Sequence, residues 1–138
     1  MQTTGRRTIR AQGLVEFAII GPLFFLMLFG VIEMSRAVYT NHQITNGTRE
    51  GARYAAVHGS KSGSPATSST VKTAMLDKMT GVSSASLTVV VSYPSGNNDP
   101  GSKVRVTSTY SFQPIVSMVF PGLGTISMTN TSEAIIRH

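Results

Sequence analysis

The most prominent feature of the chain is one apolar run near its beginning. Residues 17–32, FAIIGPLFFLMLFGVI, contain no charged side chain, and Leu14 and Val15 extend the run across Glu16. At a rise of 1.5 Å per residue, a helix over residues 14–32 spans about 28 Å, close to the roughly 30 Å of a bilayer's hydrocarbon core. The pattern predicts a membrane-spanning helix whose transmembrane residues include Leu14, Phe17, Ile20, Phe24, Leu28 and Ile32.

Beyond this run the pattern predicts that the helix continues as a weakly amphipathic stalk. Residues 33–57 contain no proline, and their apolar members fall near one helical stripe: Met34, Ala37, Val38, Ile44, Ala52 and Ala55. Gly47, Gly51 and Ala55 follow one another at intervals of four, so one helix face is nearly bare. We expect this face to be a helix-packing site within the chain, with a contact between helices in lipid as the alternative.

The rest of the chain predicts a small α+β domain. Residues 59–69 are rich in Gly, Ser and Pro and end the first helix, and a short second helix is expected over residues 70–80. Alternating apolar positions predict antiparallel strands over residues 86–93, 103–112 and 125–137. The fold class is therefore α+β: a long N-terminal transmembrane and stalk helix, a second short helix, and a small antiparallel sheet of about three strands. Because the sheet has one apolar face, the second helix and the end of the first are expected to cover it.

The segment between the last two strands, residues 112–124, is apolar and contains two prolines. The prolines exclude an uninterrupted helix or a central strand there. We expect a loop folded over the core, and a surface patch that touches the bilayer or another subunit is the alternative.

Composition and charge exclude several classes of function. The net charge is +6, but Arg6, Arg7 and Arg10 supply three of these charges, so no nucleic-acid partner is expected. The same arginines precede the apolar run and by the positive-inside rule hold the N-terminus in the cytoplasm. The chain has no cysteine, its three histidines lie far apart in sequence, and it has no phosphate-binding glycine loop or nucleophile elbow. We therefore expect no enzyme activity, no catalytic or metal site and no cofactor.

Glu16 is the one acid in the predicted span, and a carboxylate there needs a partner. Cleavage between Ala11 and Gln12 would supply one, because Gln12 would gain a free ammonium one helical turn from Glu16 of the same or a neighbouring subunit. In the alternative, Glu16 stays near the headgroups and reaches Arg10 without cleavage. Three interpretations of the segment remain open: a cleaved secretory signal, an uncleaved single-pass anchor, and a prepilin-type leader cut on the cytoplasmic side.

Pro22 is expected to break the helix inside the apolar run. A proline there removes the hydrogen bond to the Ala18 carbonyl, so a kink or local unwinding is predicted. An ordinary transmembrane proline with no further role is the alternative.

Several motifs occur together in the first 58 residues: a basic leader, a Gln-x-Leu-Val-Glu-Phe start at Gln12, Pro22 within the apolar helix, Glu33 at its exit, and Thr-Arg-Glu-Gly-Ala-Arg-Tyr-Ala from Thr48 to Ala55. In these motifs the chain resembles the TadE-like family of pilin-related proteins, although Ala11 stands where prepilins usually carry glycine. A looser similarity extends over the later Tyr-x-Phe-x-Pro and Pro-Gly-x-Gly stretches.

The resemblance implies a minor pilin or pseudopilin, a membrane-anchored subunit of pilus assembly or of a tight-adherence secretion system. Its implied partners are the membrane, a prepilin peptidase, other pilin-like subunits and the pilus assembly platform. The expected organisation is a leader at residues 1–11, a transmembrane and stalk helix at 12–58 and an extracytoplasmic head at 59–138. The expected location is the bacterial inner membrane, with the head periplasmic or extracellular, or an assembled pilus. The alternative function is a single-pass envelope scaffold that is neither cleaved nor polymerised.

Overall fold

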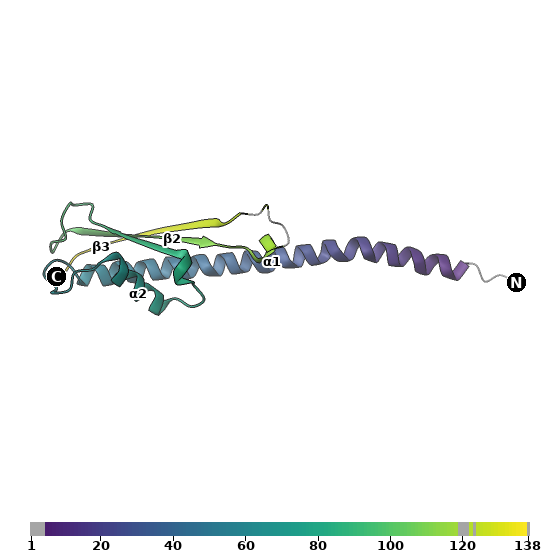
Figure 1. Cartoon of the computed structure of the whole chain (residues 1–138), viewed down its shortest axis with the longest axis horizontal. Helices are drawn as coiled ribbons and strands as arrows, with labels where there is room; N and C mark the ends of the chain where they lie inside the picture. Colours follow the sequence, from purple (N-terminus) through teal and green to yellow (C-terminus); the bar gives the residue numbers. More distant parts are fainter. Residues whose placement is uncertain (1–4, 119–121, 123, 138) are drawn as a thin grey trace. The chain divides into compact units, whose positions relative to one another are not determined.

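The computed structural model describes residues 5–118, 122 and 124–137 of the chain, with side chains described from residue 12 onward. In chain order the elements are α1 (Gly5–Val57), α2 (Ser68–Lys78), the 3-10 turn η1 (Ser84–Ser86), β1 (Leu87–Ser92), β2 (Lys103–Phe112), the 3-10 turn η2 (Ile115–Met118) and β3 (Ile126–Ile135) (Figure 1). The long helix, the short helix and the three strands confirm the α+β class. The chain forms two compact units that divide between Ser35 and Arg36.

The first unit consists of the part of α1 up to Ser35. The helix continues without interruption through Pro22, so local unwinding at this residue is not observed, and a kink there stays a prediction. Gly21 precedes the proline, and its backbone is covered by the ring of Phe17, which lies 3.8 Å from the place of a Cβ atom at Gly21. Residues 36–57 of the predicted stalk helix lie in the second unit.

The sheet of the second unit has the strand order β1-β2-β3, and both pairs are antiparallel. Leu87 pairs with Tyr110 at one end of β1, and Phe112 pairs with Ile126 where β2 leads towards β3. Every second residue of β2 from Val104 to Phe112 is buried, as the period-two pattern of a half-buried strand requires. This alternation confirms the predicted inward face of the strand.

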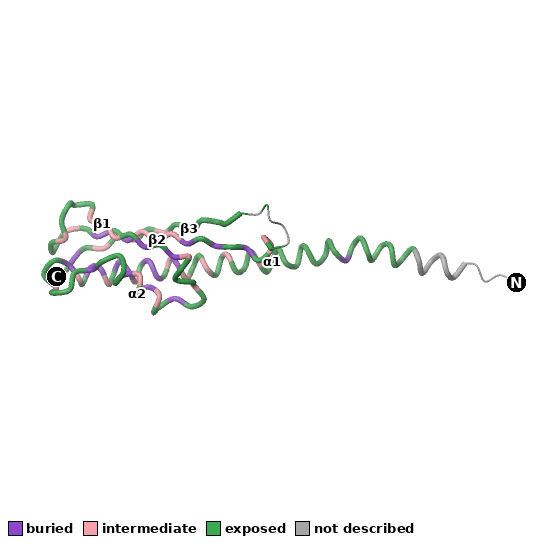
Figure 2. The backbone as a smooth tube through the Cα atoms, in the orientation of Figure 1, coloured by how far each residue is buried: buried purple, intermediate pink, exposed green. Residues whose placement is uncertain are grey.

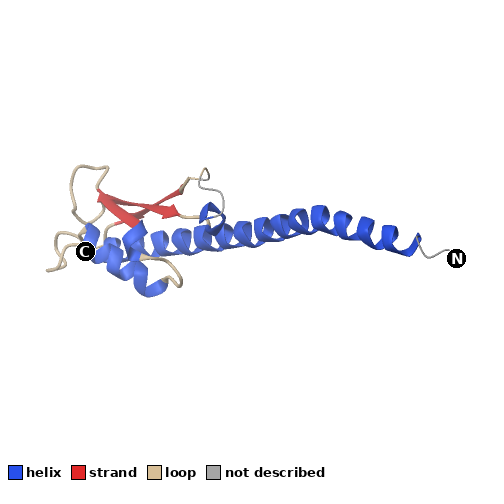
Figure 3. Ribbon diagram, turned by 45° about the vertical axis from the view of Figure 1, so that its right-hand side comes forward, coloured by secondary structure: helices blue, strands red, loops and turns tan. Residues whose placement is uncertain are grey.

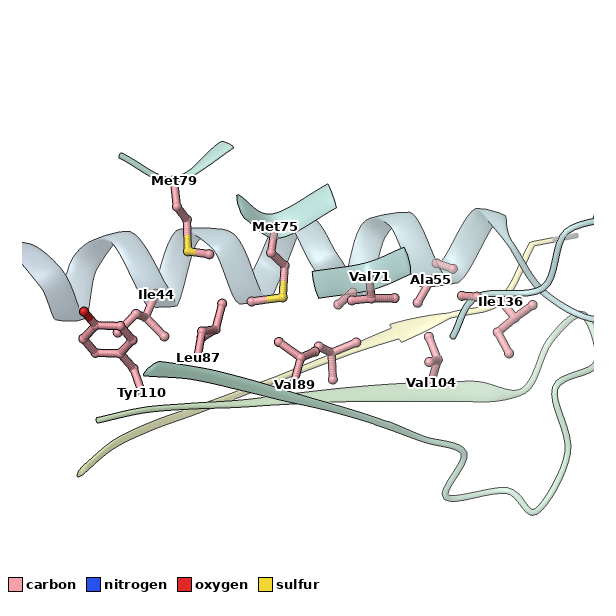
Figure 4. Packing of buried hydrophobic residues seen from close by; sticks show 14 of the residues in the cluster. Ile44, Ala55, Val71, Met75, Met79, Leu87, Val89, Val104, Tyr110 and Ile136 are labelled. Atoms are coloured by element: carbon pink, nitrogen blue, oxygen red, sulfur yellow. The ribbon is translucent and has the colours of Figure 1, made fainter. Parts of the chain in front are cut away.

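The apolar face of the sheet is covered by α1 and α2, as the sequence predicted. Figure 3 shows the sheet and α2 packed along α1 within this unit, and Figure 4 shows side chains of α2 and of the strands pointing towards one another beside α1. The core comprises Ile44, Ala52, Ala55 and Ala56 from α1, Ala66 before α2, Val71, Met75 and Met79 at α2, and Leu87, Val89, Val104, Val106, Tyr110, Phe112 and Ile136 from the sheet. The helix continues through the predicted apolar stripe, and Met34 and Val38 of that stripe are exposed. Helical periodicity defines a face but does not define how far along the helix the partner elements reach.

α2 begins and ends two residues before its predicted bounds. Thr67 is its N-cap, and Thr67 and Thr70 form a reciprocal capping box in which each side chain accepts from the other residue's backbone N–H. Threonine replaces the usual Glu or Gln at the third position, so the sequence signal was weak. The loop before α2 contacts the residue that follows β1: the Tyr93 hydroxyl donates a hydrogen bond to the Ala66 carbonyl at 3.3 Å. Burial raises the pKa of Tyr93 above its ordinary value of 10.0.

The segment after β2 does not fold over the core along its whole described length. Phe112 and Pro114 are buried, but Ile115 and Met118 in η2 are exposed. The sequence prediction is wrong for these two residues, because η2 lies beyond the end of β2 and its apolar side chains are turned away from the core. Residues 119–121 and 123 of the predicted loop lie outside the described residues.

Candidate membrane-spanning and assembly segment

The first unit exposes apolar side chains in every direction around α1. The large apolar residues between Leu14 and Ile32 are 42–72% exposed. Figure 2 shows this stretch as almost continuously exposed. A helix that is apolar all round is typical of a protein core or a membrane span, and within the described residues only 6% of this apolar window is buried. Among the described residues, one helix is long and apolar enough by length and composition to cross a membrane.

All six residues predicted to be transmembrane lie on this exposed surface: Leu14, Phe17, Ile20, Phe24, Leu28 and Ile32. Two acids frame the uncharged stretch, Glu16 before it and Glu33 after it. The 16 residues between them span about 24 Å of helix, so in a helix that crosses a bilayer both carboxylates would fall near the edges of the hydrocarbon core.

The predicted cleavage bond between Ala11 and Gln12 lies inside α1. Gln12 and Glu16 are both in the helix and four residues apart, so their backbones are separated by one turn, about 6 Å along the axis. An amine created at Gln12 would therefore lie within reach of the Glu16 side chain, which is exposed. Cleavage at Ala11 and charge pairing by Glu16 stay predictions.

Gly47 and Gly51 lie against side chains of α2 and of its C-cap residue. A Cβ atom on Gly51 would lie 2.8 Å from Met75 Cγ and 3.0 Å from Val71 Cγ1. One on Gly47 would contact the Met79 side chain, 2.8 Å from its Cγ and closer still to its Sδ. Figure 4 shows Met75 and Met79 directed towards α1. The small residues allow the methionines to lie directly on the helix backbone.

The Thr-Arg-Glu-Gly-Ala-Arg-Tyr-Ala motif places small residues against the core and charged residues outside. Thr48, Gly51, Ala52 and Ala55 are buried and occupy positions i, i+3, i+4 and i+7 of one helix face. Arg49 and Arg53 are exposed, and Arg53 pairs with Glu50 at 3.9 Å, as the i, i+3 spacing indicated. The motif therefore describes how α1 docks on α2 and the sheet, and Ala55 completes its buried face.

A buried polar contact between α1 and β2 was missed by the sequence analysis. Thr48 Oγ1 donates to the Ile44 carbonyl at 2.6 Å and lies 2.5 Å from Ser108 Oγ. Because the Thr48 hydroxyl has one proton, Ser108 is the donor in the second contact. One feature of the sequence could have indicated this contact: Ser108 is polar, but it occupies a position of β2 whose side chain faces the core, among apolar residues.

Three further contacts join α1 to the sheet. Asn130 of β3 donates its amide to Asn41 Oδ1 at 3.2 Å and accepts from Thr45 Oγ1 at 3.0 Å. The Arg36 guanidinium lies 5.5 Å from the centroid of the Phe112 ring, a cation–π distance. No local pattern indicated these contacts, because the partners lie far apart in sequence.

Among the described residues, no group of three or more His, Asp or Glu side chains could hold a metal ion. The absence of a catalytic, metal or cofactor site in the whole chain stays a prediction.

Among the described residues, a single exposed apolar helix is followed in the chain by a small α+β unit. Residues 11–53 match the family model described as TadE-like protein, which supports the assignment of this chain to the TadE-like family. The match suggests a minor-pilin-like protein associated with Tad pili. No curated protein and no solved structure gives a match.

Proposed function

We propose that this chain is a membrane-anchored minor pilin or pseudopilin of a tight-adherence pilus or secretion system. The observation that carries the proposal is the exposed apolar helix with Glu16 at its start, within the segment that matches the TadE-like family. The apolar surface of residues 14–32 holds the subunit in the bilayer. The same surface is buried again against other pilin-like subunits when the assembly platform extracts the protein, so that membrane storage and assembly use one helix.

In this proposal a prepilin peptidase cuts between Ala11 and Gln12 on the cytoplasmic side. The new ammonium at Gln12 neutralises Glu16 of the same or a neighbouring subunit, which removes the cost of a lone carboxylate in an apolar environment. The protein resides in the bacterial inner membrane with its N-terminus in the cytoplasm and its second unit in the periplasm or outside the cell. The proposal assigns it no enzymatic activity, cofactor or nucleic-acid partner.

A second candidate is a single-pass envelope scaffold that is not cleaved and does not polymerise. One observation favours it: the Ala11–Gln12 bond lies within helix α1, and a protease needs that bond in an extended conformation. In this case Glu16 stays near the headgroups and pairs with a leader arginine.

The N-terminus of the mature protein distinguishes these functions. We expect N-terminal sequencing of the protein from bacterial membranes to begin at Gln12. A start at Met1 or Gln2 would support the uncleaved scaffold, and a soluble product that begins near Val38 would identify a secretory signal and contradict both proposals.

The same preparation tests the role of Glu16. Glu16→Ala should leave membrane insertion and cleavage intact, because it removes a charge from an apolar helix, but it should abolish copurification with other pilin-like subunits. Glu50→Ala is the matched control, since Glu50 lies on a charged helix face outside the apolar segment and pairs with Arg53. Unchanged copurification of Glu16→Ala would remove the charge-pairing role.

A further inference from the structure

The second unit has exposed apolar side chains that its core does not use. Met118 is 86% exposed and Ile115 57% exposed in η2, and Ile126 at the start of β3 is 49% exposed. Val38 and Tyr39 on α1 are exposed as well. Isolated exposed apolar residues are common on protein surfaces, so the position of these five relative to one another is what matters.

The contacts between α1 and the sheet place these residues at one end of the second unit. Along α1, Arg36 contacts Phe112, Thr48 contacts Ser108, and the Ala56 carbonyl accepts from the Arg137 N–H at 2.8 Å. From Arg36 onward α1 is therefore antiparallel to β2 and parallel to β3. Because Phe112 ends β2 and contacts Arg36, the connection between β2 and β3, which contains η2, begins at the Arg36 end.

The chain connection sets how far this end lies from the apolar run. Ile32 is the last residue of that run and precedes Arg36 by four residues, about 6 Å of helix. The distance follows from covalent continuity and holds for any orientation of the second unit relative to the first. A helix that leaves the hydrocarbon core near Ile32 therefore brings the Arg36 end to the headgroup region.

The distribution of charge fits a lipid surface at this end. The sequence has no charged residue between Arg105 and Glu133, the stretch that includes η2 and the adjoining halves of β2 and β3. Arg105 pairs with Glu133 at 2.6 Å near the opposite end of the hairpin. At the near end, Tyr39 and Arg36 are residue types that favour the boundary between lipid and water.

We propose that Ile115 and Met118 insert into the headgroup region of the bilayer that holds α1. The second unit then has a lipid contact of its own beside its attachment to the helix, as a surface-binding apolar patch does. The inference rests on the proposed membrane anchoring. Lipid is favoured over a second subunit because Arg36, which contacts the end of β2, follows the apolar run by a single helical turn.

The chain contains no tryptophan, so a single introduced tryptophan reports its own surroundings. Met118→Trp and Ile115→Trp place the reporter in η2, Phe24→Trp places it in the apolar helix, and Val90→Trp places it at an exposed position of β1. Each full-length variant is reconstituted at low protein density in phosphatidylcholine and phosphatidylglycerol vesicles, with and without lipids brominated near the headgroup or deep in the acyl chain. Far-UV circular dichroism checks that each variant is folded.

We expect blue-shifted emission from Met118→Trp and Ile115→Trp, quenched most strongly by lipids brominated near the headgroup. Phe24→Trp should be quenched by deeply brominated lipids, and Val90→Trp should be quenched by neither. If Phe24→Trp is quenched and the η2 variants are not, this inference is overturned and the anchoring proposal stands. If Phe24→Trp is not quenched, the anchoring proposal itself is overturned. Equal quenching of Val90→Trp would also overturn the inference. A blue shift of Met118→Trp emission that grows with protein density and does not respond to brominated lipid would overturn the inference as well. It would show that Met118 contacts another subunit.

Discussion

Thr48 and Ser108 bring two hydroxyl groups into a core of apolar and aromatic side chains. Both residues are at most 1% exposed, so neither hydroxyl has access to water. Ser108 donates to Thr48, which donates in turn to the Ile44 carbonyl. A satisfied buried pair contributes little net free energy, but removing one member leaves the other with an unpaired polar group.

We expect Thr48→Val to lower the free energy of unfolding by about 1–3 kcal/mol, the cost of a buried polar group that loses its partner. The remaining acceptor for Ser108 is the Asn130 carbonyl at 3.5 Å, a weak contact. Ser108→Ala should cost less, because Thr48 keeps its bond to Ile44. The double variant should be more stable than the sum of the single effects predicts.

Urea unfolding of the full chain in detergent, followed by the fluorescence of the tyrosines, measures this cycle. Thr131→Val is the control, because Thr131 is exposed on the outer face of the sheet and contacts Thr107 at 3.3 Å. It should change the free energy of unfolding by less than about 0.5 kcal/mol. Strictly additive effects at Thr48 and Ser108 would show that the two hydroxyls are not coupled.

Single residues were predictable where a periodic pattern or a local spacing determined their environment. Val104, Val106, Tyr110 and Phe112 follow from alternation, and the Glu50–Arg53 pair follows from its spacing on a helix. The burial of Ser108 did not follow from the alternation, because the alternation considers only hydrophobicity. A hydroxyl group is buried only where it has a hydrogen-bond partner. That partner is Thr48, which comes from another element.

At the scale of elements, the close approach of α1 and α2 depends on Gly51. We expect Gly51→Ala to lower the free energy of unfolding by about 1 kcal/mol, since overpacking costs about 1–3 kcal/mol and the better helix propensity of alanine returns about 1 kcal/mol. The branched side chain of Val71, whose Cγ1 lies 3.0 Å from the new Cβ position, cannot bend away as a methionine can. The same urea titration measures the change.

Gly47→Ala is the matched comparison for this contact. Its new Cβ would touch Met79, a flexible side chain at the C-cap of α2, which can shift. This variant should be nearly neutral, and adding Val71→Ala to Gly51→Ala should relieve part of the overpacking. A stabilising Gly51→Ala, as expected at an open helix position, would contradict the close contact between the helices.

The elements with strong periodicity were predicted best. α1 follows from its uncharged apolar run and the proline-free stretch after it, and the three strands follow from runs of period 2. The bounds of α2 depend instead on the unusual pairing of Thr67 with Thr70. The segment after β2 was predicted to cover the core because it is apolar. Its position beyond the end of the sheet, which leaves Ile115 and Met118 exposed, is a tertiary property that hydrophobicity alone does not specify.

At the scale of the whole molecule, the apolar segment was predictable because its length and composition alone match a bilayer. The sequence predicted that Gly47 and Gly51 pack against another element, but only the structure identifies Met75 and Met79 as the side chains that contact them. The proposed role of Glu16 depends on a partner amine, which the proposed cleavage before Gln12 would create. Assembly is thus a property of several chains, and the sequence indicates it only through the family resemblance.

The last prediction concerns the independence of the second unit. The first core residue along the described chain is Ile44, and the Arg36–Phe112 and Asn41–Asn130 contacts also lie within residues 36–138. A chain that begins at Arg36 lacks the apolar run and retains this whole set of contacts. We expect it to be soluble and to unfold cooperatively, with a free energy of unfolding close to that of the second unit in the full chain, as measured by urea titration without detergent.

A chain that begins at Thr45 is the control, because it lacks Ile44, which is fully buried, and both of those contacts. Loss of a buried Ile side chain alone costs about 2–5 kcal/mol, a large share of the 5–15 kcal/mol typical of a domain. This chain should therefore unfold at a much lower urea concentration or fail to fold. If the chain that begins at Arg36 were unfolded, the second unit would need the apolar helix for its stability. The exposed surface of that helix would then have a role other than the proposed contacts with lipid and neighbouring subunits.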